Sequence, residues 1–489
     1  MPHNSQKSNR LLISFLVLLI GTNLINYFLF GHEPRKQDPV AEVAETEDYS
    51  GALPEGYVEL ELFAEVLDHV LKNYYEPVDM TGLIYGAIDG MLQSLNDPQT
   101  NFFTASDLEN FLIQTMGTFG GIGVRIVNAG DEVVIIDTIP GTPAEKAGLY
   151  PGDRIIKASG VDLIGLGVDR AVELLRGPQG TTVTISVVRP GADEVMELTL
   201  ERDDIKLETV TSQMLQPGLG YIRISSFDRN TGADFAEHFA RMQGDLQKGL
   251  ILDLRNNTGG LIDEAIKVAQ LLVPEGEITR LVDRHGQTRK IHYSSAAALP
   301  FPVVVLVNEE SASASEIVAG ALQDREAALL VGTVTFGKAT VQHLTQLSGD
   351  NALRLTVAKY LTPSGRDIHG QGLQPDYPVE MPAALKYYQY FLPGRLNQGS
   401  YGMDVELLQG MLQELGYEVK PSGYFDESTA AALVSFQKDC GLNPTGIFDD
   451  ITWVEMREAL DAIAMDHDPQ LQKAIELTGQ AELWEQARR

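Results

Sequence analysis

The stretch VVVLVNEESASASEI, residues 303–317, decides the fold of the central part of this chain. Its first five residues, 303–307, are all apolar, as in a strand that is buried on both faces of a parallel sheet. Small and polar residues follow directly, and residues 313–316 have the composition of a helix start. A strand that leads into a helix is the repeating unit of an α/β layer, and ligands bind at such turns.

The same alternation extends over residues 202–385, which we take as one domain. Continuous apolar strands that alternate with helices predict a buried α/β layer. We expect strands at 221–226, 250–254, 303–307, 329–331 and 353–359, and helices at 231–242, 261–272 and 315–323.

The N-terminal region begins with a candidate membrane segment. Residues 11–30 carry no charge, are rich in Leu, Ile and Phe, and are about long enough to span a bilayer as a helix. We therefore expect a cytoplasmic segment at 1–10, an anchor at 11–30 and an acidic linker at 31–56. A cleaved signal peptide is the alternative, although the apolar run is long for one. Residues 57–105 continue with helical spacing, which ends at Asn96-Asp97-Pro98.

Composition excludes several classes of function. The formal net charge of -31 argues against nucleic-acid binding, which needs clustered Lys and Arg. The single cysteine, Cys440, rules out an internal disulfide and is expected to be a buried structural thiol. The sequence contains no His-Glu-x-x-His motif and no cluster of Cys and His, so we predict neither a metal nor a cofactor.

Residues 106–200 resemble a PDZ domain. Short alternating strands at 133–136 and 182–188 flank the segments TPAEKAGL (142–149) and GDRII (152–156), which match that family's pattern. The glycine-rich loop before the next strand resembles the family's carboxylate-binding loop, because glycines let backbone N–H groups converge on an anion. The strand edge that follows would accept an extended peptide. The candidate peptide-binding residues of the loop are Gly120, Gly121, Ile122, Gly123 and Val124.

The C-terminal region contains an internal repeat. The sequence GYFDEST at 423–429 is echoed by GIFDDIT at 446–452, and Asp426 and Asp449 are expected helix N-caps. Together with the apolar spacing around them, these repeats resemble a small three-helix peptidoglycan-binding domain at 401–462. A dimerisation module or a purely structural cap is the alternative. Residues 386–400 are expected to be a linker, and 463–489 a tail with no predicted structure.

Three segments carry the chemistry: LRNNTGG (254–260), NEESASASE (308–316) and TFGKATVQ (335–342). They resemble the carboxy-terminal processing peptidases, also called tail-specific proteases, and this resemblance extends from about residue 55 to 385. It implies a multidomain fold. An α/β serine-protease core with ClpP/crotonase-like layers would carry an inserted, mainly-β PDZ domain and a C-terminal, all-α, three-helix domain.

The resemblance assigns roles to individual residues. Ser313 would be the nucleophile and Lys338 its base, held by Gln342, with Asp324 supporting the site from behind. The chemistry is coherent, since serine needs an adjacent base and a buried lysine can be neutral enough to serve. We expect the backbone amides of Gly259 and Ala314 to stabilise the oxyanion.

Four residues deserve comment against the family's pattern. Thr258 stands where Pro is common, Glu310 where a small residue is common, and Ala339 where Gly is common, yet none of these changes removes a reacting group. Arg176 resembles an arginine that in some members links the PDZ domain to the protease body. A solvated surface charge is the alternative for Arg176.

Other sites are less well supported by the sequence. Ser311 or Ser315 could replace Ser313 as nucleophile, and a Ser-His-Asp triad would need His343 or His369, whose spacing gives no support. No Gly-x-Ser-x-Gly elbow is present. The segment GTVTFGKA at 332–339 nearly matches a phosphate-binding P-loop. However, it lacks the Mg²⁺-binding hydroxyl and precedes a strand-like pattern at 341–347.

The sequence therefore predicts a serine endopeptidase that cleaves proteins near their C-termini, with the PDZ domain recognising or gating the tail. We expect it to be a single-pass membrane protein with its catalytic domain outside the cytoplasm, on the cell-wall or periplasmic side. The expected partners are proteins with free C-termini, peptidoglycan and the membrane itself, and the architecture is compatible with a homodimer. The rival hypothesis is a catalytically silent scaffold that binds peptide tails and peptidoglycan.

Overall fold

The computed structural model describes residues 58–189, 194–388, 395–464 and 466–480. The expected cytoplasmic segment at 1–10, the anchor at 11–30 and the acidic linker at 31–56 lie outside these residues. Within the described residues, no helix combines the length and apolarity needed to cross a membrane. The chain divides into two compact units, Met1–Gly86 and Ala87–Arg489, and each is considered by itself.

The first unit contains α2 (Val58–Asn73) and the start of α3 (Met80–Gln93). The helical spacing predicted around 57–95 is thus divided between two helices. Pro77 cannot continue a helix, and the Asp79 carboxylate accepts the N–H groups of Thr81 and Gly82 at the start of α3. Several large apolar residues of α2 are exposed: Leu60, Leu62, Phe63, Val66 and Leu71.

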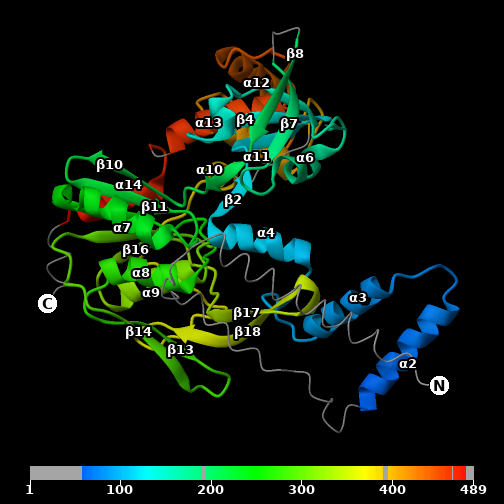
Figure 1. Ribbon diagram of the computed structural model, residues 1–489. Helices are drawn as coiled ribbons and strands as arrows, with labels where there is room; N and C mark the ends of the chain where they lie inside the picture. Colours follow the sequence, from blue (N-terminus) through cyan, green and yellow to red (C-terminus); the bar gives the residue numbers. More distant parts are fainter. Residues whose placement is uncertain (1–57, 190–193, 389–394, 465, 481–489) are drawn as a thin grey trace, which may run out of the picture. The chain divides into compact units, whose positions relative to one another are not determined.

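The centre of the second unit is a six-stranded sheet in the order β10-β11-β12-β15-β16-β19 (Figure 1). The strands from β11 to β19 run parallel, and β10 is antiparallel. The strand predictions at 221–226, 250–254, 303–307 and 329–331 are confirmed within a few residues. The bounds are β10 (Val210–Gln216), β11 (Leu219–Ile224), β12 (Gly249–Asp253), β15 (Val303–Val307), β16 (Leu329–Gly332) and β19 (Tyr377–Pro378).

Each face of this sheet is covered by helices. Val303, Val305 and Val307 belong to a cluster with α7 (Thr231–Met242), α8 (Ile262–Leu272) and α9 (Ala314–Asp324). Val304 and Leu306 point to the opposite face and pack with α14 (Pro469–Thr478). The run VVVLV is apolar throughout because both faces of its strand are buried. The sequence assigned 463–489 to a tail, yet α14 within this range covers one face of the central sheet.

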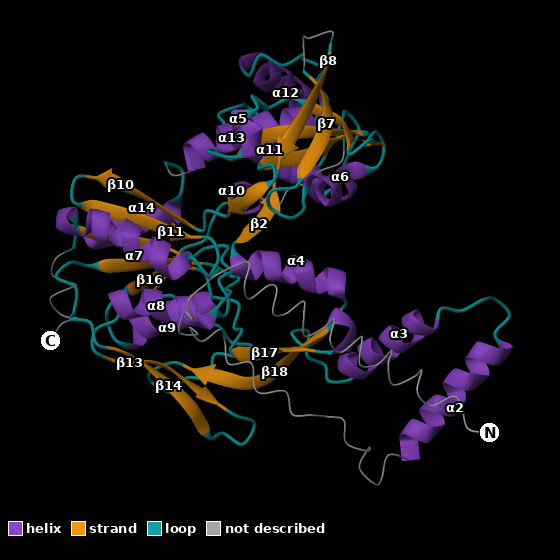
Figure 2. Cartoon of the chain, viewed as in Figure 1, coloured by secondary structure: helices purple, strands orange, loops and turns teal. Residues whose placement is uncertain are grey.

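A second sheet has the order β1-β18-β13-β14, with β17 on the other side of β18, and is visible in orange in Figure 2. β17 starts directly after Lys338 and Ala339, where a P-loop would open a helix, so the P-loop alternative is wrong. The bounds are β1 (Asn101–Phe103), β13 (Gly276–Val282), β14 (Thr288–Ser294), β17 (Thr340–Gln346) and β18 (Ala352–Leu361). The short 3₁₀ helices are η1 (Gln243–Asp245) and η2 (Ser348–Asp350).

The predicted PDZ region forms a sheet in the order β3-β4-β5-β7-β8, with β6 beside β5. β3 is an edge strand of this sheet, and the helices Gly167–Leu175 and Asp450–Ala464 both contact it. α4 (Ala105–Met116) and a β2-β9 pair connect this region to its flanks. The bounds are β2 (Thr118–Gly121), β3 (Val124–Ala129), β4 (Glu132–Thr138), α5 (Pro143–Lys146), β5 (Arg154–Ala158), β6 (Val161–Asp162), α6 (Gly167–Leu175), β7 (Thr182–Val188), β8 (Val195–Glu201) and β9 (Asp203–Lys206).

The internal repeat forms a module of α11 (Met403–Glu414), α12 (Glu427–Asp439) and α13 (Asp450–Ala464), preceded by α10 (Ala383–Tyr387). Asp426 and Asp449 accept the N–H groups of Thr429 and Thr452, both at 2.9 Å, so both predicted N-caps are confirmed. Cys440 is half-buried at the end of α12, less enclosed than predicted. Its thiol packs against the module's apolar cluster, and burial raises its pKa, which disfavours the reactive thiolate.

Candidate active site

Ser313 occupies a strained turn between β15 and α9. Its backbone has φ 55° and ψ -112°, a region that non-glycine residues rarely adopt, and α9 begins at the next residue. Such outliers persist only where their surroundings fix them, and they concentrate at functional sites. The turn presents a serine at the N-terminus of a helix, where a developing negative charge is favoured.

The three serines of the run differ in how their hydroxyls are used. The Ser311 hydroxyl donates to the Leu254 carbonyl at 2.8 Å, and the Ser315 hydroxyl donates to the Asn257 carbonyl at 2.8 Å. Both side chains are fully buried, whereas Ser313 retains 8% exposure. Ser311 and Ser315 therefore tie the turn to the 254–260 segment, which leaves Ser313 as the serine placed for chemistry.

A buried carboxylate connects the Ser313 turn with the Lys338 loop. Glu316 is inaccessible to solvent, and its Oε2 accepts the backbone N–H of Ser313 at 2.9 Å and of Lys338 at 2.8 Å. Its Oε1 accepts the Gly337 N–H at 2.8 Å and the Thr335 hydroxyl. Burial raises the pKa of Glu316, although these hydrogen bonds favour its charged form. The sequence analysis treated Glu316 only as part of a helix start and missed this role.

Tyr360 of β18 forms a second connection between the same two segments. Its hydroxyl lies 3.1 Å from the Ser313 carbonyl oxygen and 3.0 Å from that of Lys338, so it can donate to either. The side chain is almost fully buried, and its own amide donates to the Ala339 carbonyl. Glu316 and Tyr360 together hold the backbones of Ser313 and Lys338 in a fixed relation.

The pKa of Lys338 is lowered, which is the direction that a lysine base requires. Burial lowers the pKa of its ammonium group, and the positive charge of Arg354 lowers it further. Asp97 and Glu316 act in the opposite direction, and the net shift is downward. A larger fraction of neutral amine at a given pH follows from a lower pKa.

A polar network lies beside the lysine. The Asp97 carboxylate accepts the Thr100 hydroxyl at 2.7 Å, and Thr100 in turn accepts the Thr356 N–H at 3.1 Å. Burial raises the pKa of Asp97, but hydrogen bonds from Thr356, Thr100 and the Gln99 amide outweigh it and hold the pKa below its usual value. The Gln342 amide group donates to the hydroxyls of Thr340 and Thr356, at 2.9 and 3.1 Å. Gln342 thus belongs to this network, and its hydrogen bonds go to two threonines.

The expected oxyanion donors lie side by side. A Cβ atom on Gly259 would come within 2.8 Å of the Ser313 Cβ and 3.0 Å of the Ala314 nitrogen, so only glycine permits this approach. Ala314 is the first residue of α9, where a backbone N–H has no partner within its helix. The Gly259 N–H donates to Asn257 Oδ1 at 2.9 Å, so in this structure that donor is engaged.

Other predicted site residues lie apart from this centre. Asp324 is the last residue of α9, about 15 Å along the helix from its start. It binds the Ser364 amide at 2.9 Å and forms an ion pair with Arg366, so it fastens a surface turn. Glu310 is exposed, and Ala339 is buried in the main apolar core.

The predicted peptide-binding loop is held in place within the PDZ region. Gly120 faces Gly177, whose N–H donates to the Gly120 carbonyl at 3.1 Å, and a Cβ on Gly120 would lie 2.0 Å from the Gly177 oxygen. Ile122 is buried, and Val124 starts the edge strand β3. The Arg176 guanidinium lies 5.0 Å from the centre of the Phe119 ring, a cation–π contact that neither sequence interpretation predicted.

The two histidines that a Ser-His-Asp triad would need are His343, which lies in β17, and His369, which acts electrostatically on Asp97. Among the described residues, no group of three His, Cys, Asp or Glu side chains is placed to hold a metal ion.

Comparison with known families matches four parts of the chain. Peptidase family S41 covers residues 218–379, the PDZ domain 112–188, and the peptidoglycan binding domain 401–456. The N-terminal domain of the activating protease CtpB matches residues 18–106. The order of these matches is that of the predicted domains.

Whole-chain relatives agree with these matches. The carboxy-terminal processing protease CtpA of Bacillus subtilis is 36% identical over 410 residues, which cover 84% of this chain and 88% of that protein. The chain belongs to the carboxy-terminal processing proteases of peptidase family S41. The Bartonella bacilliformis carboxy-terminal-processing protease is 38% identical over 68% of this chain and 78% of its own length. CtpB of Bacillus subtilis is 32% identical over 83% of this chain and 86% of its own length.

Membership makes the protein a serine-type endopeptidase that processes C-termini, in place of the silent scaffold that the sequence left as an alternative. The predicted multidomain class, with an S41 core, a PDZ domain and a C-terminal helical region, is confirmed. In this protease, the strained serine turn and the lysine loop converge on the Glu316 carboxylate.

We predict that Glu316→Gln destabilises the protease. The substitution replaces one acceptor oxygen by an NH₂ group that must face two N–H or O–H donors inside the core. A buried donor left without an acceptor costs about 1–3 kcal/mol, so the free energy of unfolding should fall by that amount. Chemical denaturation of the purified variant measures this loss, and Glu310→Gln, on the exposed side of the turn, is the matched control. If the two variants have equal free energies of unfolding, the hydrogen bonds of Glu316 do not stabilise the fold.

Proposed function

We propose that this protease cleaves peptide bonds with Ser313 as nucleophile and Lys338 as general base. The observation that carries the proposal is the Glu316 carboxylate, which binds the backbones of both residues through one oxygen. Support also comes from the lowered pKa of Lys338 and from the engagement of the Ser311 and Ser315 hydroxyls by carbonyl groups.

The reaction follows from this arrangement. The Ser313 oxygen attacks the carbonyl carbon of the scissile bond while the neutral Lys338 amine takes the hydroxyl proton. The tetrahedral oxyanion accepts a hydrogen bond from the Ala314 N–H at the start of α9, and Gly259 can add a second if its amide leaves Asn257. The C–N bond then breaks, and Lys338 returns the proton to the leaving amine. Water, activated by the same lysine, hydrolyses the acyl-enzyme ester and regenerates Ser313.

Gln342 supports the lysine indirectly in this mechanism. Its amide bridges Thr340, two residues after Lys338, to Thr356 on the neighbouring strand. Thr356 also binds the Thr100 hydroxyl, which binds Asp97. Gln342 therefore helps to fix the β17–β18 floor next to the base, and its own side chain need not contact the lysine nitrogen.

Substitution of the pair tests the proposal. Ser313→Ala and Lys338→Ala should each abolish cleavage of an unfolded protein substrate without loss of the fold, and the double variant should be no worse, since the two groups act as a unit. Lys359→Ala is the control, because this lysine lies on β18 and forms an ion pair with Asp367. Turnover and circular dichroism are measured together. Substantial activity in a folded Lys338→Ala variant would defeat the lysine-base model.

The pH dependence gives a sharper test. A lysine base is active when neutral, so kcat/KM should rise with pH through its pKa. Arg354 lowers that pKa, and Arg354→Gln should therefore move the acidic limb of the profile to higher pH. Asp97 raises it, and Asp97→Asn should move the limb to lower pH. Arg354→Lys keeps the charge and should leave the limb in place. If Arg354→Gln and Asp97→Asn move the acidic limb in the same direction, the assignment of this limb to Lys338 is wrong.

We propose that the PDZ domain reads the substrate's free C-terminus through the 120–124 loop and pairs the tail along β3. Support comes from β3 being the edge strand and from the ties that hold the loop to Gly177. Arg176 contacts Phe119, one residue before the loop, and so is placed to respond when a tail binds. Tail binding and catalysis would then share a coupling free energy, typically ~1–3 kcal/mol.

Amidation of a substrate's C-terminus should lower its cleavage roughly 5- to 150-fold, as that coupling implies. Acid and amide forms of one peptide are compared on the intact protease and on Arg176→Ala. The intact protease should prefer the acid, and the preference should shrink in the variant while the two forms still bind. If the intact protease cleaves both peptides alike, the PDZ domain does not read the carboxylate.

We further propose that the protease acts at the cell envelope. The apolar segment 11–30 supports a single-pass membrane anchor, and the 401–456 module supports attachment to peptidoglycan on the outer side. Exposed apolar residues on α2 are consistent with a homodimer. Cell fractionation should recover the full chain with membranes and the isolated 381–464 module with purified cell walls. A chain found wholly in the cytoplasm would overturn this location.

A further inference from the structure

The chain returns to the catalytic core after the peptidoglycan-binding module. The helix α14 lies beside the central sheet (Figure 1). Three of its apolar residues pack with strand residues that are at most 8% exposed. They are Leu471, Ala474 and Leu477, and their sheet partners are Leu219, Tyr221, Ile251, Val304, Leu306 and Val331. In the sequence, the module therefore lies between two segments that belong to the protease fold.

Asp468, at the start of α14, uses both carboxylate oxygens. Oδ1 accepts the N–H groups of Gln470 and Leu471, both at 2.9 Å, and so caps the helix. Oδ2 accepts a hydrogen bond from Arg255 Nη1 at 2.5 Å. The capping function alone would be served by Asn, Ser or Thr. The second bond is the feature that calls for a carboxylate.

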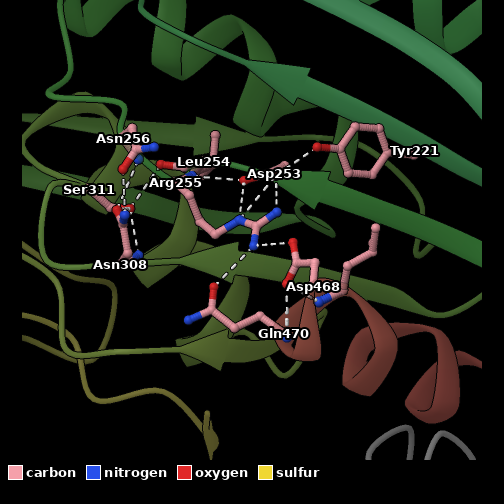
Figure 3. Close-up of polar contacts among 10 residues, drawn as sticks. Tyr221, Asp253, Leu254, Arg255, Asn256, Asn308, Ser311, Asp468 and Gln470 are labelled. Atoms are coloured by element: carbon pink, nitrogen blue, oxygen red, sulfur yellow. Dashed lines mark hydrogen bonds and ion pairs between the residues drawn. The ribbon is translucent and has the colours of Figure 1, made fainter. Parts of the chain in front are cut away.

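Arg255 is the meeting point of this cluster (Figure 3). Its Nε and Nη2 bind the Asp253 carboxylate, with the shortest distance 2.6 Å, and its Nη1 also lies 3.1 Å from Gln470 Oε1. Tyr221 donates to Asp253 at 2.6 Å. Arg223 also acts on Asp253, so two arginines balance the carboxylates of Asp253 and Asp468. Removal of one carboxylate from such a buried cluster leaves an uncompensated charge, so loss of Asp468 should disturb the position of Arg255.

The segment that begins at Arg255 leads directly to the nucleophile turn. Asn256 and Asn308 exchange two hydrogen bonds, of 2.9 and 2.6 Å, which join the ends of β12 and β15. Ser311 then binds the Leu254 carbonyl, as Figure 3 also shows, and Ser313 follows two residues later. Arg255 therefore lies one residue from the contacts that fix the strained turn.

We propose that Asp468 is a positioning residue for catalysis, which acts through Arg255 on the turns that carry Gly259 and Ser313. The inference rests on the proposed role of Ser313. It makes the last helix of the chain a component of the active-site scaffold, and the peptidoglycan-binding module an insertion before that component.

Asp468→Asn in the full-length protease tests this. Asparagine retains the helix cap through its one oxygen, and its NH₂ group replaces the charged acceptor that faces Arg255. A turn displaced by a fraction of an ångström should lower kcat roughly 10- to 100-fold with little change in KM. Asp466→Asn removes an exposed charge just before α14 and should match the wild type. A kcat for Asp468→Asn equal to that of Asp466→Asn would overturn the inference.

A double-mutant cycle separates positioning from general stability. Asp468→Asn and Asn308→Ser should be non-additive in kcat/KM if both act on one network, and additive effects would contradict the relay. If Asp468→Asn fails to fold, Asp468→Glu keeps the charge but moves it. That variant should lower kcat while its unfolding midpoint stays near the wild-type value. A folded Asp468→Glu with unchanged kcat would again refute the role.

Failure of this inference is distinct from failure of the proposed function. Labelling of Ser313 by a serine-reactive probe reports the nucleophile directly, and Ser313→Ala is the blank. If Ser313→Ala is inactive and Asp468→Asn is labelled at the wild-type rate, only the positioning role is lost. If Ser313→Ala remains active, the dyad itself is wrong.

Discussion

The fold of the catalytic unit depends on one constraint: a parallel sheet must be covered on both faces. The strand 303–307 offers apolar side chains alternately to the α7–α9 layer and to α14, and none of them reaches solvent. The backbone groups of short parallel strands are free only at the strand ends. The segment 254–260 follows the end of β12, and the segment 308–316 follows the end of its neighbour β15. Burial on both faces therefore leaves the carboxyl edge of the sheet as the place for polar chemistry.

The chemistry at that edge requires an unfavourable backbone conformation that its surroundings must hold. Ser313 has a positive φ, and its neighbours Ser311 and Ser315 each bind a carbonyl of the opposite turn. Glu316 receives the Ser313 amide, and Tyr360 donates to its carbonyl. These contacts come from three different parts of the chain. The unfavourable conformation of Ser313 persists because several contacts fix it together.

The sequence predicted the strand-helix pattern well because periodicity and apolar runs are local signals. It proposed Ser313, Lys338 and Gln342 through motifs, and the structure connects the segments of Ser313 and Lys338 through Glu316. It missed Glu316 because a glutamate in the first turn of a helix usually faces the helix dipole and solvent. It missed Asp97 and Tyr360 because their contacts join residues far apart in sequence. The helix α14 escaped notice because a ten-residue amphipathic segment in an acidic tail gives a weak signal on its own.

Electrostatics explains why this site can exist in a chain with a formal net charge of -31. A lysine base must stay partly neutral, yet nearby carboxylates raise its pKa. The two that act on Lys338, Asp97 and Glu316, are both saturated by hydroxyl and amide donors. Burial of the lysine and the positive charge of Arg354 outweigh the two carboxylates, so the pKa of Lys338 is lowered. The acidic surface can thus serve solubility, while the local balance at Lys338 is set by a few nearby groups.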